Sequence, residues 1–337
     1  MISYPTLKKE ATIGVTAPSS GVRAELHGMF RLAIERISSR GFNVVTGETA
    51  WTQDKAKSAP SRIRAAEFNE MMRNEKIDII IPPWGGELLI EVLQDIDFSF
   101  MKNKWLLGYS DTSALMLAIT LKTGIATAHG TNFVDLRGEY WDDTTAKWEA
   151  VLSTEPGGTI IQHSSPQYQL SWEHGTPSPC VFHLTDETKW KTAGGAPVNV
   201  EGRLLGGCID VIRHLIGTEF GDVAGFREKH IPGEPVLWYM ENCDMNVTDL
   251  RRSLVQMKYG GWFENCSGIL FGRSSANESV GNFTVEDVYH DLADELGVPV
   301  VYDIDCGHMP PQVTFINGAY GVVEVADGKG KVEQRFV

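Results

Sequence analysis

The sequence predicts an α/β protein of two domains, the first built on a parallel sheet and the second of mixed α/β type. With 337 residues, the chain is long enough for two domains of ordinary size. In its first half, short β-rich runs alternate with helical patterns across short links, which is typical of a parallel sheet covered on both faces. A stretch over 164–197 that is rich in Ser, Pro and aromatic residues then breaks this rhythm, as a connection between domains would.

The elements of the first half follow from hydrophobic spacing and from glycine and proline punctuation. The expected strands cover 11–17, 42–45, 77–81 and the run that ends at Gly108, and the expected helices cover 26–37 and begin near Pro60, Glu87 and Asp111. Gly41 suits the C-cap of the first helix, and Pro60 suits the first turn of the second.

The second half carries both kinds of pattern as well. The expected strands cover 236–240, 268–271 and 298–302, and the expected helices cover about 208–216, 247–259 and 285–296. Thr284 is a good N-cap for the last helix, with Asp287 three residues on. Asn317-Gly318 and Asp327-Gly328 are typical of hairpin turns. The chain is therefore predicted to have a Rossmann-like N-terminal domain over 1–165 and a C-terminal α/β domain over 198–337. Residues 166–197 between them are predicted to form a linker that also serves as a substrate loop.

Composition excludes several classes of partner and location. The net charge of −14 argues against nucleic-acid backbones and anionic membrane surfaces as partners. The N-terminus lacks the apolar core of a signal peptide, and no apolar run reaches the length of a membrane span. The five cysteines are scattered and form no C-x-x-C pair, which favours reduced thiols in a cytoplasmic protein.

The stretch from Gly108 to Asp111 lies where a strand pattern stops and a helical pattern begins. Ser110 is open to two interpretations there. Serine is a favoured N-cap and Asp111 suits the positive end of a helix dipole, so capping alone explains both residues. Alternatively, the turn presents the Ser110 hydroxyl as a nucleophile, which needs a base, a group that orients the base, and donors for an oxyanion.

Catalytic groups on α/β sheets gather at the carboxyl ends of strands, so the partners of Ser110 are sought there. His308 follows a buried strand and stands before a Met-Pro-Pro break, and a neutral imidazole suits the base. His129 also follows a strand-like segment and stays a competitor. Glu241 ends an apolar strand, where a carboxylate needs a partner, and so suits the orienting group. Its rivals by position are Asp244, Asp303 and Asp305.

Two further interpretations concern the same strand ends. The turn at Gly85-Gly86 lets the backbone approach a ligand closely, and its N–H groups and that of Asp111 suit an oxyanion, although an ordinary β-α turn explains the glycines equally well. A metal site at Asp303, Asp305 and His308 is a weaker alternative, because the spacing matches no familiar site. We expect neither a metal nor a cofactor.

The ordered set of motifs resembles the LD-carboxypeptidase family of serine peptidases, and its microcin C self-immunity clade most of all. The motifs span nearly the whole chain and are IGVTAPSSG at 13–21, Gly85-Gly86, GYSD at 108–111, EGRLLGGC at 201–208, YMEN at 239–242 and DCGHMPP at 305–311. The resemblance implies a nucleophile at Ser110 on the N-terminal domain, with Glu241 and His308 on the C-terminal domain. It also implies oxyanion donors at Asp111 and the Gly85-Gly86 turn, and a homodimer.

Two departures bear on the substrate. Cys208 stands where murein-recycling members commonly have Asn, and the chain is longer than theirs around 164–197. Both favour the immunity clade, whose members cleave an amide between an acidic aminoacyl or peptidyl group and a nucleotide-like moiety. The alternatives are an LD-carboxypeptidase that trims murein tetrapeptides and a binding protein that sequesters a peptide-nucleotide without chemistry. The presence of all three triad candidates argues against a pure binder.

Four aromatic residues in the irregular stretch are candidates for substrate binding, namely Tyr168, Trp172, Phe182 and Trp190. They either pack the domain boundary, or one tryptophan stacks on a substrate base, an interaction worth about 1–3 kcal/mol. We favour Trp190 slightly over Trp172, because Trp190 lies nearer the return into the C-terminal domain. The expected partner is a small peptide-like or aminoacyl-nucleotide substrate.

Overall fold

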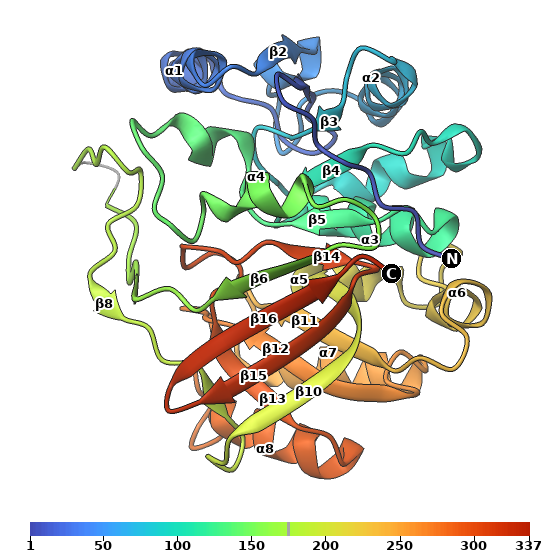
Figure 1. Ribbon diagram of the computed structural model, residues 1–337, viewed down its shortest axis with the longest axis vertical. Coiled ribbons are helices and arrows are strands. Elements are labelled where there is room, and N and C mark those ends of the chain that lie inside the picture. The colour runs from blue at the N-terminus through green and yellow to red at the C-terminus, as the bar shows by residue number, and fades with distance from the viewer. Residues whose placement is uncertain (174–175) are drawn as a thin grey trace.

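The computed structural model describes residues 1–173 and 176–337, so His174 and Gly175 of the expected linker lie outside the described residues. Two sheets with parallel strands at their centres, each flanked by helices, make up the molecule (Figure 1). The predicted α/β class is confirmed. Within the described ranges, no helix combines the length and the apolarity that a membrane crossing requires.

The first sheet has six strands in the order β14-β5-β4-β3-β1-β2. They are β1 (Thr12–Val15), β2 (Asn43–Thr46), β3 (Ile79–Ile80), β4 (Trp105–Gly108), β5 (Thr127–His129) and β14 (Phe315–Asn317). All neighbours are parallel except β14, which runs antiparallel to β5. The helices that accompany this sheet are α1 (His27–Ser39), α2 (Ser61–Arg73), α3 (Thr112–Thr123) and α4 (Lys147–Leu152).

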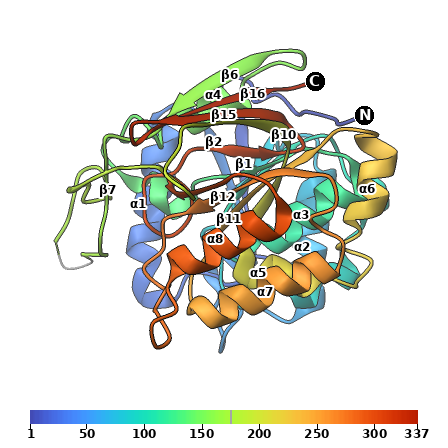
Figure 2. The same ribbon diagram turned by 90° about the horizontal axis from the view of Figure 1, so that it is seen from below.

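The second sheet has eight strands in the order β6-β16-β15-β10-β11-β12-β13-β9. They are β6 (Thr159–His163), β9 (Lys191–Thr192), β10 (Val198–Cys208), β11 (Val236–Glu241), β12 (Cys266–Gly272), β13 (Val300–Ile304), β15 (Tyr320–Ala326) and β16 (Lys329–Arg335). Strands β10 to β13 are mutually parallel. The helices of this half are α5 (Ile209–Ile212), α6 (Val223–His230), α7 (Val247–Tyr259) and α8 (Val285–Leu296), with α5, α7 and α8 together on one side of the strands (Figure 2).

The remaining elements are short. They are the two-stranded ribbon β7 (Gln167–Tyr168) with β8 (Asp186–Glu187), and the 3₁₀ helices η1 (Ala24–Leu26), η2 (Glu48–Trp51), η3 (Leu89–Asp95), η4 (Phe98–Phe100), η5 (Phe133–Arg137) and η6 (Arg213–Leu215). The α-helix expected from Glu87 is therefore wrong in type and start. The Asp111 carboxylate accepts the Leu89 N–H at 2.8 Å, and the chain from Leu89 forms η3.

Helix α3 joins the two sheets. It is apolar around its whole circumference, and every residue from Thr112 to Leu121 is buried. The helix contacts β5 of the first sheet and β10 of the second. The Ser113 hydroxyl accepts the Cys208 N–H at 3.0 Å, which fixes the start of the helix to the end of β10.

Strands also cross between the expected parts of the chain. β6 precedes the expected boundary at residue 165 but pairs with β16 in the second sheet, and β14 follows His308 but pairs with β5 in the first. The hairpin expected at Asn317-Gly318 is therefore wrong, because β14 and β15 belong to different sheets. Asn317 instead connects the two sheets. Its side-chain oxygen accepts the Gly206 N–H of β10 at 2.9 Å, and its side-chain nitrogen donates to the Thr127 hydroxyl of β5 at 3.2 Å. The turn at Asp327-Gly328 does join the paired strands β15 and β16.

Candidate active site

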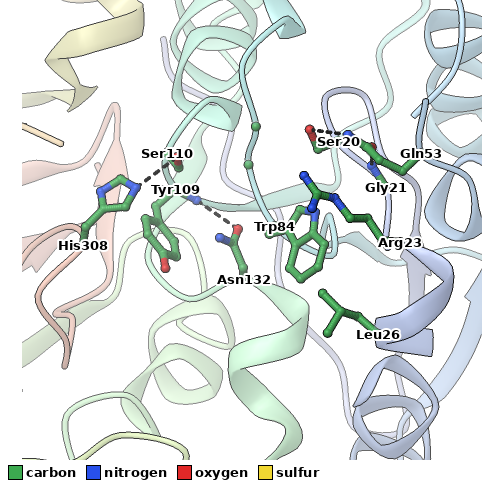
Figure 3. A pocket seen from close by; sticks show the side chains of 12 residues that line it. Ser20, Gly21, Arg23, Leu26, Gln53, Trp84, Tyr109, Ser110, Asn132 and His308 are labelled. Atoms are coloured by element: carbon green, nitrogen blue, oxygen red, sulfur yellow. Dashed lines mark hydrogen bonds between the residues drawn. The ribbon is translucent and has the colours of Figure 1, made fainter. Parts of the chain in front are cut away.

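The site begins at the carboxyl ends of three parallel strands of the first sheet. The strand order 2-1-3-4-5 places a topological switch point between β1 and β3, where ligands bind in open α/β sheets. Ser20 follows β1, the Gly85-Gly86 turn follows β3, and Ser110 follows β4. All of them line one cleft of about 380 Å³, which Figure 3 shows from close by.

Ser110 lies on a sharp turn between β4 and α3. Its φ of 63° falls in the left-handed region that non-glycine residues rarely adopt. Helix α3 begins at Thr112, and neither Ser110 nor Asp111 caps it through a side chain. The Ser110 hydroxyl instead lies 3.1 Å from Nε2 of His308. The conformation of this turn therefore points the Ser110 hydroxyl away from α3 and into the cleft.

His308 and Glu241 come from the carboxyl ends of two strands of the second sheet. Glu241 is the last residue of β11, and His308 follows β13. Nδ1 of His308 lies 2.8 Å from Oε2 of Glu241, so His308 bridges the carboxylate and the serine. Gly307 permits this approach, because a Cβ at that position would lie 2.6 Å from Glu241.

Electrostatics couple the imidazole and the carboxylate. Burial lowers the pKa of His308, but the Glu241 charge and the hydrogen bonds of Cys243 and Glu241 outweigh it, so the pKa lies well above its ordinary value of 6.5. Glu241 is 0% exposed. Burial raises the pKa of this carboxyl, yet the His308 charge and hydrogen bond hold it below its ordinary value. Cys208, at the end of β10, places its thiol beside the same carboxylate.

The Gly85-Gly86 turn lies against Ser110. A Cβ on Gly85 would meet Oγ of Ser110 at 2.7 Å and the Asp111 nitrogen at 2.9 Å, so glycine alone fits. The backbone N–H groups of Gly85, Gly86 and Asp111 donate to no acceptor among the residues that the structure describes. The buried Asp111 carboxylate accepts from Ser19 and from the Leu89 N–H, which holds the turn in place. Burial raises the pKa of Asp111.

A second, larger cavity adjoins the catalytic cleft. It measures about 880 Å³ and lies among α1, η5 and residues of 169–173 and 176–183. The two cavities share Leu26, Trp84, Tyr109, Asn132 and His308. A molecule that reaches Ser110 in the smaller cleft therefore has room to extend past Trp84 into the larger one.

The structure separates the two tryptophans that were candidates for stacking on a base. Trp172 lines the larger cavity, is 40% exposed, and donates its indole N–H to the His308 carbonyl at 3.3 Å. Trp190 is 1% exposed and donates its indole N–H to the buried Asp305 at 2.8 Å. A fully buried ring offers no face to a ligand, so the preference for Trp190 is corrected: it packs the core.

The rival residues have other contacts. His129 is fully buried, its Nδ1 lies 3.8 Å from the Cys306 sulfur, and burial lowers its pKa to about 4. Asp303 pairs with Lys191 at 2.8 Å, and Asp305 with Arg273 at 2.6 Å. Asp303 and Asp305 therefore do not converge with His308, and no group of three His, Cys, Asp or Glu residues suited to a metal ion occurs in the described ranges.

Several residues that line the cleft were missed by the sequence analysis. They are Ser20, Arg23, Gln53, Trp84, Tyr109 and Asn132. Their positions after strands were a usable signal for Ser20, Trp84, Tyr109 and Asn132, since each follows β1, β3, β4 or β5. Arg23 and Gln53 lie in irregular segments, where no pattern marks the direction of a side chain.

Family models match both halves of the chain. The LD-carboxypeptidase N-terminal domain matches residues 13–130, and the LD-carboxypeptidase C-terminal domain matches residues 201–323. Together these matches contain Ser110 and every glycine, glutamate and histidine of the site described above.

Similar proteins cover nearly the whole chain. A putative carboxypeptidase of Vibrio cholerae is 26% identical over 96% of each chain. The microcin C7 self-immunity protein MccF of Escherichia coli is 24% identical over 97% of this chain and 94% of its own. A probable murein peptide carboxypeptidase of Bacillus subtilis is 25% identical over 97% and 93%.

Solved structures share the fold. MccF in complex with glutamyl sulfamoyl guanosine matches with a TM-score of 0.85 and 19% identity over the full length of both chains. The muramoyltetrapeptide carboxypeptidase of Oxalobacter formigenes matches with a TM-score of 0.74 and 19% identity over 96% of this chain and 99% of its own. With both family domains matched in order, the chain belongs to the LD-carboxypeptidase family of serine peptidases.

Proposed function

We propose that this chain is a serine peptidase with a Ser110-His308-Glu241 triad, which hydrolyses the amide between an acidic aminoacyl or peptidyl group and a nucleotide-like moiety. One observation carries the proposal: His308 lies 3.1 Å from the Ser110 hydroxyl and 2.8 Å from the Glu241 carboxylate. These are the contacts that a general base and its orienting group require.

The reaction follows from these contacts. Oγ of Ser110 attacks the amide carbonyl while Nε2 of His308 takes its proton, and Glu241 stabilises the imidazolium that forms. The negative oxygen of the tetrahedral intermediate faces the N–H groups of Asp111 and the Gly85-Gly86 turn. His308 then protonates the leaving nitrogen, and the acyl group stays on Ser110. Water, deprotonated by His308, cleaves this ester, releases the acid and restores the serine.

The choice of a nucleotide-like leaving group is supported by the larger cavity. It holds about 880 Å³, adjoins the catalytic cleft and has Trp172 in its wall. Its size suits a nucleoside, and an indole face suits stacking on a base. MccF, a relative of the same fold, has been solved with glutamyl sulfamoyl guanosine.

A second candidate is the trimming of murein tetrapeptides. The smaller cleft alone, about 380 Å³, has room for a single leaving residue beside Ser110. A relative that covers almost the whole chain is named a probable murein peptide carboxypeptidase. The two candidates share the triad and differ only in what occupies the larger cavity.

The test uses both substrates and two variants. The parent, Ser110→Ala and the control Ser39→Ala, on the exposed end of α1, are each incubated with an aminoacyl-sulfamoyl adenosine and with a murein tetrapeptide. Mass spectrometry identifies the products. We expect Ser110→Ala to lose several orders of magnitude in rate while retaining binding, and Ser39→Ala to match the parent.

Three results would change the proposal. Turnover by Ser110→Ala within tenfold of the parent removes Ser110 as the nucleophile. Release of the C-terminal residue from the tetrapeptide alone selects the second candidate. Tight binding without turnover of either compound by the parent identifies a sequestering protein.

The assembly and location stay predictions. We propose a homodimer in the cytoplasm, as the family resemblance and the five free cysteines suggest. Light scattering during gel filtration measures the number of chains in the assembly, and cell fractionation shows the compartment in which the protein lies.

A further inference from the structure

One cation reaches into the catalytic cleft. Arg23 lines the cleft with Ser110 and His308, and its side chain extends from the side of the cleft opposite His308 (Figure 3). The other lining residues, apart from His308, carry no charge. In a chain with a net charge of −14, a guanidinium in the wall of the cleft that holds the nucleophile is a specific feature.

The guanidinium of Arg23 makes no hydrogen bond, ion pair or ring contact with any residue of the described ranges. Arg64, by contrast, is buried. It pairs with Glu91 at 2.6 Å and donates to the Pro18 carbonyl at 2.7 Å. Both terminal nitrogens of Arg64 thus have protein acceptors although its buried Nε has none among the described residues, whereas the donors of Arg23 are left for a ligand.

Neutral donors accompany the guanidinium. The side-chain oxygen of Gln53 accepts the Gly21 N–H at 2.8 Å, and the Gln53 amide nitrogen donates to the Lys55 carbonyl at 3.2 Å and to the Ser20 hydroxyl at 3.5 Å. Ser20 and Gln53 line the same end of the cleft as Arg23. A planar guanidinium flanked by an amide and a hydroxyl suits an anionic group with two or three oxygens.

This end of the cleft lies on the route to the larger cavity. Leu26, three residues after Arg23, and Trp84 belong to the walls of both cavities. A substrate with its amide at Ser110 whose leaving group enters the larger cavity between Leu26 and Trp84 passes this end of the cleft. The group joined to the leaving nitrogen therefore comes next to Arg23.

We propose that Arg23, with Ser20 and Gln53, binds an anionic group carried by the leaving side of the substrate, within a few bonds of the scissile amide. The inference rests on the proposed function and names a feature that both candidate substrates share. A peptide cleaved at its C-terminus carries a carboxylate on the leaving residue. An aminoacyl-sulfamoyl nucleoside carries negative charge on the sulfamoyl group, because its acyl sulfamate N–H is acidic.

The test compares matched charged and neutral substrates on the parent, Arg23→Gln and Arg23→Lys. One pair is a murein tetrapeptide and its C-terminal carboxamide. The second is an aminoacyl-sulfamoyl adenosine and the aminoacyl amide of 5′-amino-5′-deoxyadenosine, which lacks the sulfamoyl group. A third pair, glutamyl- and glutaminyl-sulfamoyl adenosine, differs only on the acyl side. Arg62→Gln, an exposed arginine on α2, is the matched control.

We expect the parent to prefer the anionic member of the first or second pair by about 10- to 100-fold in kcat/KM, the range of a charge-assisted hydrogen bond. Arg23→Gln should lose most of this preference, mainly through KM, and change the rate on the neutral member by less than about threefold. Arg23→Lys should keep part of the preference, and Arg62→Gln all of it. The pair that responds distinguishes a carboxylate from a sulfamoyl group.

Three outcomes overturn the inference. They are persistence of the preference in Arg23→Gln, an equal loss of rate on both members of each pair, and a response of the glutamyl-glutaminyl pair alone, which would assign Arg23 to the acyl side. If the parent cleaves nothing, the proposed function fails separately. Calorimetric binding of the sulfamoyl probe to Ser110→Ala, with and without Arg23→Gln, then still decides the role of Arg23.

Discussion

Small residues set the distances at the candidate catalytic centre. Ser110 adopts a left-handed φ of 63°, and Gly85 and Gly307 stand where a side chain would collide with Ser110 and Glu241. A non-glycine residue in the left-handed region costs of order 1–3 kcal/mol and persists only where its surroundings fix it. Here the surroundings are the end of β4, the buried α3 and the glycine turn. These contacts aim the hydroxyl at His308.

Gly85→Ala tests how closely the turn and the nucleophile are fitted. The added Cβ would lie 2.6 Å from Cβ of Ser110 and 2.7 Å from its Oγ, so one of the two must move. A displacement of about 1 Å can cost about 10²-fold in rate. We expect kcat to fall by about that factor, with circular dichroism unchanged. Gly28→Ala is the control, because no atom lies within 4 Å of its Cβ and alanine favours the helix. Full activity in Gly85→Ala would contradict the fit.

The pH dependence of the rate tests the His308-Glu241 pair. His308 must be neutral to accept the serine proton, and its pKa lies well above 6.5. We therefore expect kcat/KM to rise with pH through a pKa above 6.5. Glu241→Gln removes the charge that raises this pKa and leaves burial, which lowers it. The acid limb should then shift to lower pH, while kcat falls by up to about 10⁴-fold, as in a triad that loses its carboxylate. If the acid limb of the pH profile of Glu241→Gln stays where it is in the parent, Glu241 does not set the pKa of the titrating group.

At the scale of elements, a buried cluster ties the segment 165–192 to the strand that precedes His308. Asp305 accepts from the Ser165 hydroxyl at 2.6 Å and from the Trp190 indole at 2.8 Å, and it pairs with Arg273 at 2.6 Å. All four side chains are almost completely buried. The cluster anchors both ends of the segment that walls the larger cavity, and it lies three residues from His308.

Trp190→Ala and Trp172→Ala separate anchoring from ligand contact. Removing a fully buried tryptophan costs about 3–5 kcal/mol of unfolding free energy, so Trp190→Ala should lower the denaturation midpoint strongly. Trp172 is 40% exposed, and its loss should cost about 1 kcal/mol or less. The effects on affinity should be reversed. Trp172→Ala should weaken the binding of an aminoacyl-sulfamoyl adenosine by about 10- to 100-fold and should change the binding of a ligand without the base only slightly. Equal loss on both ligands would make Trp172 structural as well.

Local sequence patterns predicted many helices and strands correctly. They failed where contacts between residues far apart in the chain determine the structure. Helices α7 and α8 lie over 247–259 and 285–296 as expected, and Thr284 caps α8 as its position in the sequence indicates. The Asn317-Gly318 turn carries a hairpin signal, yet the partner of β14 is β5, nearly 190 residues earlier. Trp190 likewise has no sequence signal for Asp305, since only the fold brings them together. Ser110, Glu241 and His308 could be found from the sequence because each lies at or shortly after the end of a recognisable strand.

At the scale of the whole molecule, the two sheets depend on each other. Segment 1–165 supplies β6 to the second sheet, and the chain after His308 supplies β14 to the first. Helix α3 buries its apolar surface against both. The candidate triad is divided in the same way, with Ser110 on the first sheet and Glu241 and His308 on the second. Separation of the sheets would expose α3 and break the Ser110-His308 contact at once.

This mutual dependence predicts that the chain unfolds as one cooperative unit. A fragment that ends at residue 165 lacks β14 and leaves the buried helix α3 without β10, so neither half retains a complete core. Differential scanning calorimetry should show a single transition in which the calorimetric and van't Hoff enthalpies agree. Hydrolytic activity should be lost over the same temperature range, since the triad spans both sheets. The calorimetric transition of Ser110→Ala, which keeps β6, β14 and α3 in place, should also be single. Two resolved transitions would show that the shared strands and α3 do not couple the sheets.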